Sequence, residues 1–424
     1  MLSTLKNAWK IPELRTKIKY TFLLLVVFRL GAMVPAPGID IEIVRSIVEE
    51  AGLLAMFDMF SGGAFGNMTI FALSITPYIT ASIIMNLLTV AIPKLEELAK
   101  EGEEGRKKIS QYTRYATVIL ALIQATGISV GLFRGALERP GAFNVIVLIM
   151  TLTAGTAFLM WLGEQITEKG IGNGISLIIF AGIIAGIPNG AINTFRLIRT
   201  GEIGVFNILI FLAIVLAIVM GVVAIQEGTR KIPVQYAKRV VGRKMYGGQS
   251  THIPLKVNQS GVIPVIFAMS VMALPQTLTL FLGNESGFGR FVATWFSPNG
   301  TPGIFIYSIL SAILIIFFTY FYTAITFNPV EVASNMKKYG GFIPGIRPGK
   351  PTTEYLTKVL NRITLAGAVF LATITILPMI ILNFTNIPIA LGGTAILIVV
   401  GVALETMKQV ESQMLMRHYQ GFLK

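Results

Sequence analysis

The chain has 424 residues, of which 54% are hydrophobic and 13% are charged, and its mean hydropathy is +0.71. A soluble globular protein carries about 25% charged residues, so this composition excludes a surface that faces only water. The chain has no cysteine and only two distant histidines, His252 and His418, which excludes disulfides, thiolate chemistry and a His-rich metal site.

Ten apolar stretches are long enough to cross a bilayer as helices, because about 20 apolar residues span its hydrocarbon core. We therefore predict an all-α membrane protein with ten transmembrane helices. The predicted spans are residues 20–36, 70–91, 113–133, 143–163, 173–190, 205–226, 261–283, 303–327, 363–383 and 387–405. The prolines inside these spans include Pro77, Pro264, Pro275 and Pro378, each of which can kink its helix.

The N-terminal segment, residues 1–19, is basic, and Trp9 and Leu14 are interspersed among its charges. This pattern is typical of a helix that lies at the membrane surface, and the alternative is a solvated arm.

The segment between the first two spans, residues 53–69, is moderately apolar but too short to cross the membrane. Its run Ser61–Ala64, followed by Gly66, would break a helix. Non-helical backbone at membrane depth is tolerated only inside protein or beside a water-filled cavity. A re-entrant segment that lines a funnel and an amphipathic loop on the outer surface fit this composition equally well.

Isoleucines recur at helical spacing in two spans, as Ile75, Ile79 and Ile83 and as Ile175 and Ile179. Taken alone, such stripes usually face lipid or neighbouring helices. Polar side chains within the spans can pair at helix interfaces. Deeply placed ionisable residues are nearly absent, and Arg29 lies toward the end of its span, which argues against a proton- or ion-coupled transporter.

The run Gly170–Gly174 (GIGNG) is glycine-rich, but the chain has no phosphate-binding G-x-x-x-x-G-K-[ST] motif. We interpret this run as a tight turn between the fourth and fifth spans. Hydrolase motifs are missing as well. We therefore predict a protein that is not an enzyme, with no catalytic residue, no cofactor and no metal. Energy for any transport would come from a partner or from the membrane potential.

The spans divide into two sets of five, joined near residues 190–204, so we predict an N-terminal half, 1–190, and a C-terminal half, 191–424. With an odd number of spans in each half, the second half enters the membrane from the opposite side, as in an inverted-topology repeat.

Two long basic loops belong to the second half. Residues 228–259 have a strand-like pattern with Gly and Pro turns, and in residues 328–362 Pro344, Gly345, Pro348 and Gly349 place Arg347 on a turn. The charges of these loops serve either membrane orientation and attraction to anionic lipid or the docking of a partner.

Basic residues are distributed unequally between the two predicted sides. Of the 35 Lys and Arg residues, 28 lie on the side of the termini and long loops, 6 lie on the other side, and Arg29 lies within the first span. The positive-inside rule therefore places both termini in the cytoplasm. The formal charge of +14 reflects this topology and not nucleic-acid binding.

Eight phrases, in order along essentially the whole chain, closely resemble the bacterial SecY family. They are Met59–Ala64 (MFSGGA), Pro77–Ser82 (PYITAS), Glu103–Tyr115 (EEGRKKISQYTRY), Trp161–Thr167 (WLGEQIT), Gly170–Ser176 (GIGNGIS), Gln249–His252 (QSTH), Pro254–Asn258 (PLKVN) and Ile343–Gly349 (IPGIRPG). The chain departs from the family in a short loop between the third and fourth spans and in a short C-terminal tail.

The resemblance implies a protein-conducting channel of the bacterial cytoplasmic (inner) membrane. Such a channel passes unfolded secretory polypeptides across the membrane and releases apolar segments laterally into lipid. Its fold would be a clamshell of two pseudo-symmetric, inverted five-helix halves around an hourglass pore. The implied partners are the small membrane subunits SecE and SecG, the SecA motor ATPase, the ribosome, signal-sequence-bearing polypeptides and anionic lipids.

The resemblance also implies roles for individual residues. The pore ring would be Ile75, Ile79, Ile175, Ile179, Ile266 and Ile398. The plug, near residues 57–68, would include Phe57, Met59, Phe60, Ser61, Gly62, Gly63 and Phe65. The lateral gate would separate spans two and three on one side from spans seven and eight on the other. It would include Thr80, Ile83, Asn86, Gln124 and Gln276. Motor and ribosome docking would use Arg243, Lys244, Lys337, Lys338 and Arg347.

Two other classes of protein compete with this interpretation. A secondary transporter with five-plus-five inverted repeats would need buried charges at mid-membrane, and the spans lack them. A lipid-handling membrane enzyme would need clustered His, Asp or Glu at one interface, and the sequence has no such cluster.

Overall fold

The fold is that of a computed structural model, which describes residues 2–50, 58, 61–137, 141–201, 204–236, 239–241, 244–246, 250–282, 286–296, 302–385 and 393–421. Four residues with predicted roles lie outside this part of the chain: Phe57, Met59, Phe60 and Arg243.

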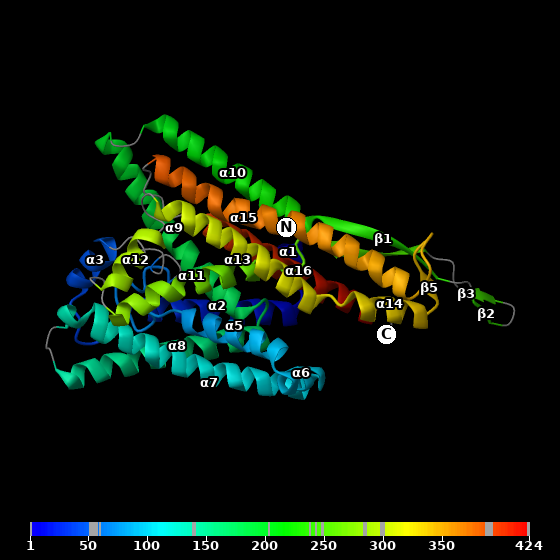
Figure 1. The fold of residues 1–424 in the computed structure, drawn as a ribbon, viewed down its shortest axis with the longest axis horizontal. Coiled ribbons are helices and arrows are strands. Elements are labelled where there is room, and N and C mark those ends of the chain that lie inside the picture. Colours follow the sequence, from blue (N-terminus) through cyan, green and yellow to red (C-terminus); the bar gives the residue numbers. More distant parts are fainter. Residues whose placement is uncertain are drawn as a thin grey trace.

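Helices make up most of the described chain (Figure 1). The first half contains α1 Leu2–Lys10, α2 Pro12–Gly31, α3 Ile41–Glu50, α5 Thr76–Ala91, α6 Pro93–Lys100, α7 Glu103–Gly127, the π-helical turn η1 Ile128–Leu132, the 3-10 turn η2 Arg134–Ala136, α8 Ala142–Lys169 and α9 Gly174–Thr200. The second half contains α10 Val205–Glu227, α11 Ile263–Leu282, α12 Gly287–Trp295, α13 Gly303–Thr326, α14 Pro329–Lys338, α15 Lys350–Thr385 and α16 Gly393–Gly421. The strands are β1 Thr229–Tyr236, β2 Arg239–Val241, β3 Lys244–Tyr246, β4 Ser250–Lys256 and β5 Gly341–Phe342.

Seven stretches of the described chain are long and apolar enough to cross a membrane, and they lie along α7, α8, α9, α10, α13, α15 and α16. Helices α5 and α6 add an eighth if they form one span, although a bend of 99° separates them. Helix α11 is apolar but shorter, and α2 carries charged residues toward both of its ends. Each predicted span overlaps one of these helices, so the prediction of a mostly helical, multi-pass membrane protein is confirmed.

Two of the four prolines that we named as possible kinks do not interrupt a helix. Pro77 and Pro264 lie in the first turns of α5 and α11. A proline in the first turn removes an N–H that has no partner within the helix, so the expected kinks are wrong at these two positions. Pro275 and Pro378 do lie inside α11 and α15, and Pro188 lies inside α9.

The turn between the fourth and fifth predicted spans is confirmed. Gly172 has a φ of +91°, a backbone conformation that residues other than glycine rarely adopt. Asn173 then caps α9, because its side-chain oxygen accepts hydrogen bonds from the N–H groups of Ile175 (3.1 Å) and Ser176 (3.3 Å). Helix α9 continues to Thr200, so the predicted boundary at residue 190 falls inside this helix.

The predicted N-terminal helix is also present, but as two helices, α1 and α2, because Pro12 begins the second one. Ala8 and Leu14 are buried against Ile171 and Val410, so this segment packs on the rest of the protein and is not a solvated arm.

The two basic loops fold into one small unit. Strand β1 pairs antiparallel with β4 and also with β5, which comes from the second loop, in the order β4-β1-β5. Ile232 and Leu255 of this sheet are buried against Met336 of α14 and Leu356 of α15. The sheet and α14 lie at one end of the long axis of the molecule, and α3 and α12 lie at the other (Figure 1).

Candidate functional site

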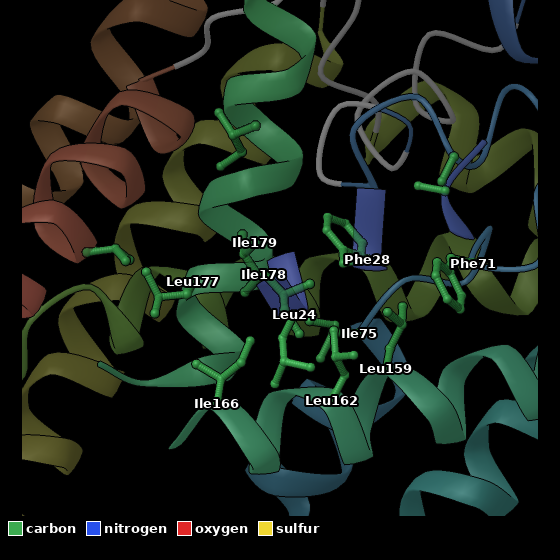
Figure 2. Packing of buried hydrophobic residues seen from close by; sticks show 14 of the residues in the cluster. Leu24, Phe28, Phe71, Ile75, Leu159, Leu162, Ile166, Leu177, Ile178 and Ile179 are labelled. Atoms are coloured by element: carbon green, nitrogen blue, oxygen red, sulfur yellow. The ribbon is translucent and has the colours of Figure 1, made fainter. Parts of the chain in front are cut away.

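The six isoleucines of the predicted ring lie in one hydrophobic cluster. Ile75, Ile179 and Ile398 are buried, with at most 7% of their surface exposed, and Ile79, Ile175 and Ile266 are partly buried and pack against them. They come from α5 and its N-cap, α9, α11 and α16. In Figure 2, Ile75 and Ile179 point into a continuous cluster with Leu24 of α2 and Leu162 of α8. The cluster therefore joins helices from both halves of the chain.

A cavity of about 90 Å³ lies beside this cluster and is lined by five of the six isoleucines. The rest of its lining combines the apolar Val265, Met269 and Ala273 with residues that carry polar groups, among them Gln276 and Tyr307. Ile175 does not line the cavity. Its side chain packs over Gly163, where an added Cβ would lie 2.5 Å from Ile175 Cδ1. Five of the six isoleucines thus line the cavity, and the sixth packs against α8.

The segment before α5 is largely buried, and from Gly62 to Ile75 it consists of turns and bends. Ser61 and Thr69 are each 1% exposed, and Ser74 has a φ of +51°. Residues 61–69 are therefore inside the protein, and the interpretation as an amphipathic surface loop is wrong for them. The predicted span at residues 70–91 is helical only from Thr76.

Contacts with α8 and with the α2–α3 loop hold the end of this segment. The Ile70 N–H donates to the Val34 carbonyl (3.0 Å), and the Ala36 N–H donates to the Met68 carbonyl (2.8 Å). The Ile70 carbonyl also approaches α8 so closely that a Cβ at Gly155 would lie 1.9 Å from its oxygen. A buried, irregular backbone needs such partners for its polar groups.

We call residues 58 and 61–67 the plug segment. Hydrogen bonds between its own residues hold this segment together. The Asp58 carbonyl accepts from the Gly63 N–H (2.9 Å), and the Asp58 carboxyl accepts from the Gly66 N–H (2.6 Å). Gly62 has a φ of +67°, and a Cβ there would lie 2.7 Å from the carbonyl oxygen of Gly182 in α9. Both the turn and this backbone contact therefore require glycine at position 62.

Two arginines outside the plug segment hydrogen-bond to it. Arg29 Nη1 of α2 donates to the Gly62 carbonyl at 2.9 Å. Arg45 of α3 donates to Asn67 Oδ1 from Nη2 (2.5 Å) and Nε (3.2 Å). Our sequence interpretation gave neither arginine a role. The available signal was that Arg29 is the one Lys or Arg that the charge count assigned to neither side of the membrane, and cations within a span often mark functional sites.

The outward face of the plug segment borders a polar pocket of about 620 Å³, whose lining includes Arg45, Asp58, Asn67, Asn193 and Arg196. Burial raises the pKa of the Asp58 carboxyl above its ordinary value, against the opposing effects of the Gly66 and Phe65 N–H groups, Ser61 and Arg45. The plug segment thus separates a polar pocket from the apolar isoleucine cluster, in which its own Ala64 takes part.

The predicted gate residues lie on α5, α7 and α11, and α11 contacts both α5 and α7. Ile83 is buried in a cluster with residues of α11 and α13, and Asn86 and Gln124 are half-buried. The Thr80 hydroxyl donates to the Thr76 carbonyl of its own helix (3.1 Å). Gln276 Nε2 donates to the Phe296 carbonyl (3.4 Å), which belongs to the same half of the chain. These hydrogen bonds of Thr80 and Gln276 do not cross the contact.

The predicted docking residues are on or beside the small sheet unit. Arg347 is exposed on a turn between β5 and α15, where Gly345 and Gly349 have φ values of +81° and +102°. Lys337 and Lys338 are exposed in the last turn of α14, and Lys244 begins β3. Arg347 therefore occupies a turn shaped by glycine, as its flanking residues predicted.

Across the described residues, no group of three or more His, Asp or Glu side chains is arranged to hold a metal ion. Some of the charged side chains form ion pairs between helices. Arg114 of α7 binds Glu164 of α8 (2.7 Å), and Lys408 of α16 binds Glu227 of α10 (2.8 Å).

The fold is similar to those of solved channels. A structure titled "The structure of a protein conducting channel" matches with a TM-score of 0.65 and 21% identity, over 93% of this chain and 91% of that one. A structure titled "Sec61 in the Canine ribosome-channel complex from the endoplasmic reticulum" matches with a TM-score of 0.63 and 20% identity, with the same coverage.

The sequence is similar to those of curated relatives over its whole length. It is 50% identical to a protein translocase subunit SecY of Halalkalibacterium halodurans, with all of both chains covered. It is also 45% identical to the protein of that name from Aquifex aeolicus, again with both chains fully covered. The profile of the SecY family matches residues 69–407. The chain therefore belongs to the SecY family.

Proposed function

We propose that the isoleucine cluster and the plug segment are two successive barriers in this channel subunit. The chain is a protein-conducting channel and not an enzyme. The observation that carries the proposal is that six isoleucines from four helices meet directly beside the plug segment, whose Ala64 is buried among them. An apolar constriction blocks water and ions by dewetting, and its aliphatic side chains can yield to a passing polypeptide. The plug segment would seal the polar side of this constriction.

The lateral gate is the contact of α5 and α7 with α11 and α13, and Thr80, Ile83, Asn86, Gln124 and Gln276 are its candidate residues. Support comes from the hydrogen bonds of Thr80 and Gln276, which do not cross this contact. Parting the helices would leave both groups paired, so apolar packing would supply most of the resistance to opening. This arrangement suits the release of apolar segments into lipid, and the transporter alternative is not favoured.

The ten predicted spans correspond to α2, α5, α7, α8, α9, α10, α11, α13, α15 and α16, arranged as two inverted halves. The halves would meet near Gly201, which follows α9 with a φ of +78°. We place both termini and the small sheet unit in the cytoplasm of a bacterial cell, because the basic residues gather on that side. A single external signal from a reporter fused at residue 245 or 345 would contradict this orientation.

The sheet unit is the docking surface for a motor ATPase such as SecA and for the ribosome, through Arg243, Lys244, Lys337, Lys338 and Arg347. Its exposed arginine on a shaped turn supports this assignment, because a charge needed only for orientation would not require that shape. SecE and SecG are the expected membrane partners, signal-sequence-bearing polypeptides are the substrates, and anionic lipids would contact the basic residues.

Ion conductance of reconstituted bilayers tests the two barriers. Ile79→Ser with Ile266→Ser should wet the constriction, and deletion of residues 61–66 in the same chain should remove the second barrier. We expect a large leak from the combined variant. The matched control is Ile119→Ser, at a position of α7 that is 60% exposed. If the combined variant is as tight as the wild type, these isoleucines do not form the seal.

A further inference from the structure

We infer that Arg29 is a positioning residue that holds the plug segment in its closed place through the main-chain carbonyl of Gly62. This inference rests on the proposed function, because it takes the plug segment to be a barrier. Arg29 is half-buried in the last turn of α2, beside the buried Phe28. Its Nη1 lies 2.9 Å from the Gly62 oxygen. A cation in an apolar helix is costly unless it is paired, and this carbonyl is a partner.

The carbonyl of Gly62 is suited to such a contact. Other carbonyls of the plug segment accept local hydrogen bonds, including those of Asp58, Gly63 and Ala64. The backbone at Gly62 instead packs directly on Gly182 of α9. Arg29 thus satisfies a carbonyl oxygen at the position where the segment meets α9, and a charged donor forms the stronger kind of hydrogen bond.

The second contact joins Arg45 to Asn67. Both side chains line the open polar pocket, and Arg45 is exposed. Water competes for exposed polar contacts, so this contact should hold the segment less firmly than that of the half-buried Arg29.

The contacts that carry this inference come from the first half of the chain, whereas Ala64 also takes part in the isoleucine cluster, which spans both halves. Arg29 lies in α2, Arg45 in α3 and Gly182 in α9. Phe65 packs with Phe133, which follows the π-helical turn, at a ring distance of 5.9 Å. Separating α5 and α7 from α11 would leave these contacts in place. Arg29 therefore controls the plug separately from the lateral gate.

Accessibility of a cysteine in the plug segment tests this inference, and the chain offers a clean background because it has no cysteine. Ser61 is 1% exposed, so Ser61→Cys should react slowly with a membrane-impermeant maleimide added from the side of α3. We expect Arg29→Met to raise the labelling rate about tenfold, which corresponds to about 1.4 kcal/mol. Arg29→Lys, which keeps the charge, should give an intermediate rate. The control is Arg199→Met, because the Arg199 guanidinium lies over the Phe195 ring (5.1 Å).

Ion conductance without the cysteine separates the possible outcomes. Arg29→Met should raise the leak only when the plug segment is present, because deletion of residues 61–66 already removes Gly62, the partner of Arg29. If deletion of residues 61–66 causes no leak, even with the serine ring substitutions, the proposed function fails. If that deletion leaks but Arg29→Met changes neither labelling nor conductance, the inference alone is overturned. An equal increase in the presence and absence of the plug segment would also overturn it, because Arg29 would then act through the packing of α2.

Discussion

Replacement of Gly155 by alanine should destabilise the protein, although alanine is the better helix former. Gly155 lies within α8, where an added Cβ would stand 1.9 Å from the Ile70 oxygen and 2.9 Å from the Ile70 carbonyl carbon. Ordinary contact begins at 3.4 Å, so the two backbones would have to separate by about 1.5 Å. A flexible side chain could rotate away, but these contacting atoms are main-chain atoms.

The expected size follows from three contributions. Overpacking a filled interior costs about 1–3 kcal/mol. Moving Ile70 also weakens its hydrogen bond to Val34, which adds about 1 kcal/mol. The helix preference of alanine over glycine offsets about 0.5–1 kcal/mol. The net loss in the free energy of unfolding is therefore about 1–3.5 kcal/mol.

Denaturant unfolding in detergent micelles measures this loss. The matched control is Gly186→Ala in α9, where an added Cβ meets nothing within 4 Å. The control should be neutral or more stable, by up to about 1 kcal/mol, from helix preference alone. If Gly155→Ala is as stable as Gly186→Ala, the close approach of Ile70 to α8 is wrong.

Three further predictions concern the plug segment and the docking turn. Gly62→Ala should displace the plug segment, because Gly62 has a positive φ and its backbone contacts α9. The variant should therefore raise bilayer conductance in the chain that also carries Ile79→Ser and Ile266→Ser. The control Gly38→Ala, at a φ of +76° with no neighbour within 4 Å, should not raise it. Burial raises the pKa of Asp58, so its contribution to plug seating is fully present below its ordinary value of 3.8 and is lost as pH rises through the raised pKa. Conductance in that same background should therefore increase with pH over this range, whereas an Asp58→Asn variant should show no such increase. Arg347→Glu should abolish motor-driven translocation into membrane vesicles without reducing insertion of the channel itself into the membrane. Arg347→Lys should retain only part of the translocation rate, since lysine lacks the planar fork of donors. A wild-type rate for Arg347→Glu would limit this arginine to a role in membrane orientation.

The positions of the spans were predictable because hydropathy is a local property and a membrane helix satisfies its own backbone groups. The same reasoning failed at residues 70–75, which are apolar but adopt turns. Their polar groups find partners in Val34 and in neighbouring turns, and hydropathy does not distinguish a buried turn from a buried helix. Helix α9 extends to Thr200, beyond its predicted end at residue 190, because Pro188 lies inside the helix and does not end it.

The isoleucines illustrate a second limit of the sequence. Spacing placed Ile75 and Ile79 on one helix face, but faces toward lipid, a pore and a neighbouring helix are all apolar. The family resemblance proposed six members for the ring. The structure then gathered all six into one cluster and separated Ile175, which packs over Gly163, from the five that line the cavity.

The sequence by itself determined the membrane character, the approximate spans, the unequal distribution of charge and the glycine-shaped turns at Gly172 and Arg347. Each of these depends on residues that are close together in the chain. Only the tertiary structure decided that β5 joins β1, that Ile70 lies against Gly155 and that Arg29 holds Gly62. These contacts join distant segments through main-chain atoms, and every residue presents the same main-chain carbonyl and, except for proline, the same N–H, so no pattern of side chains announces them.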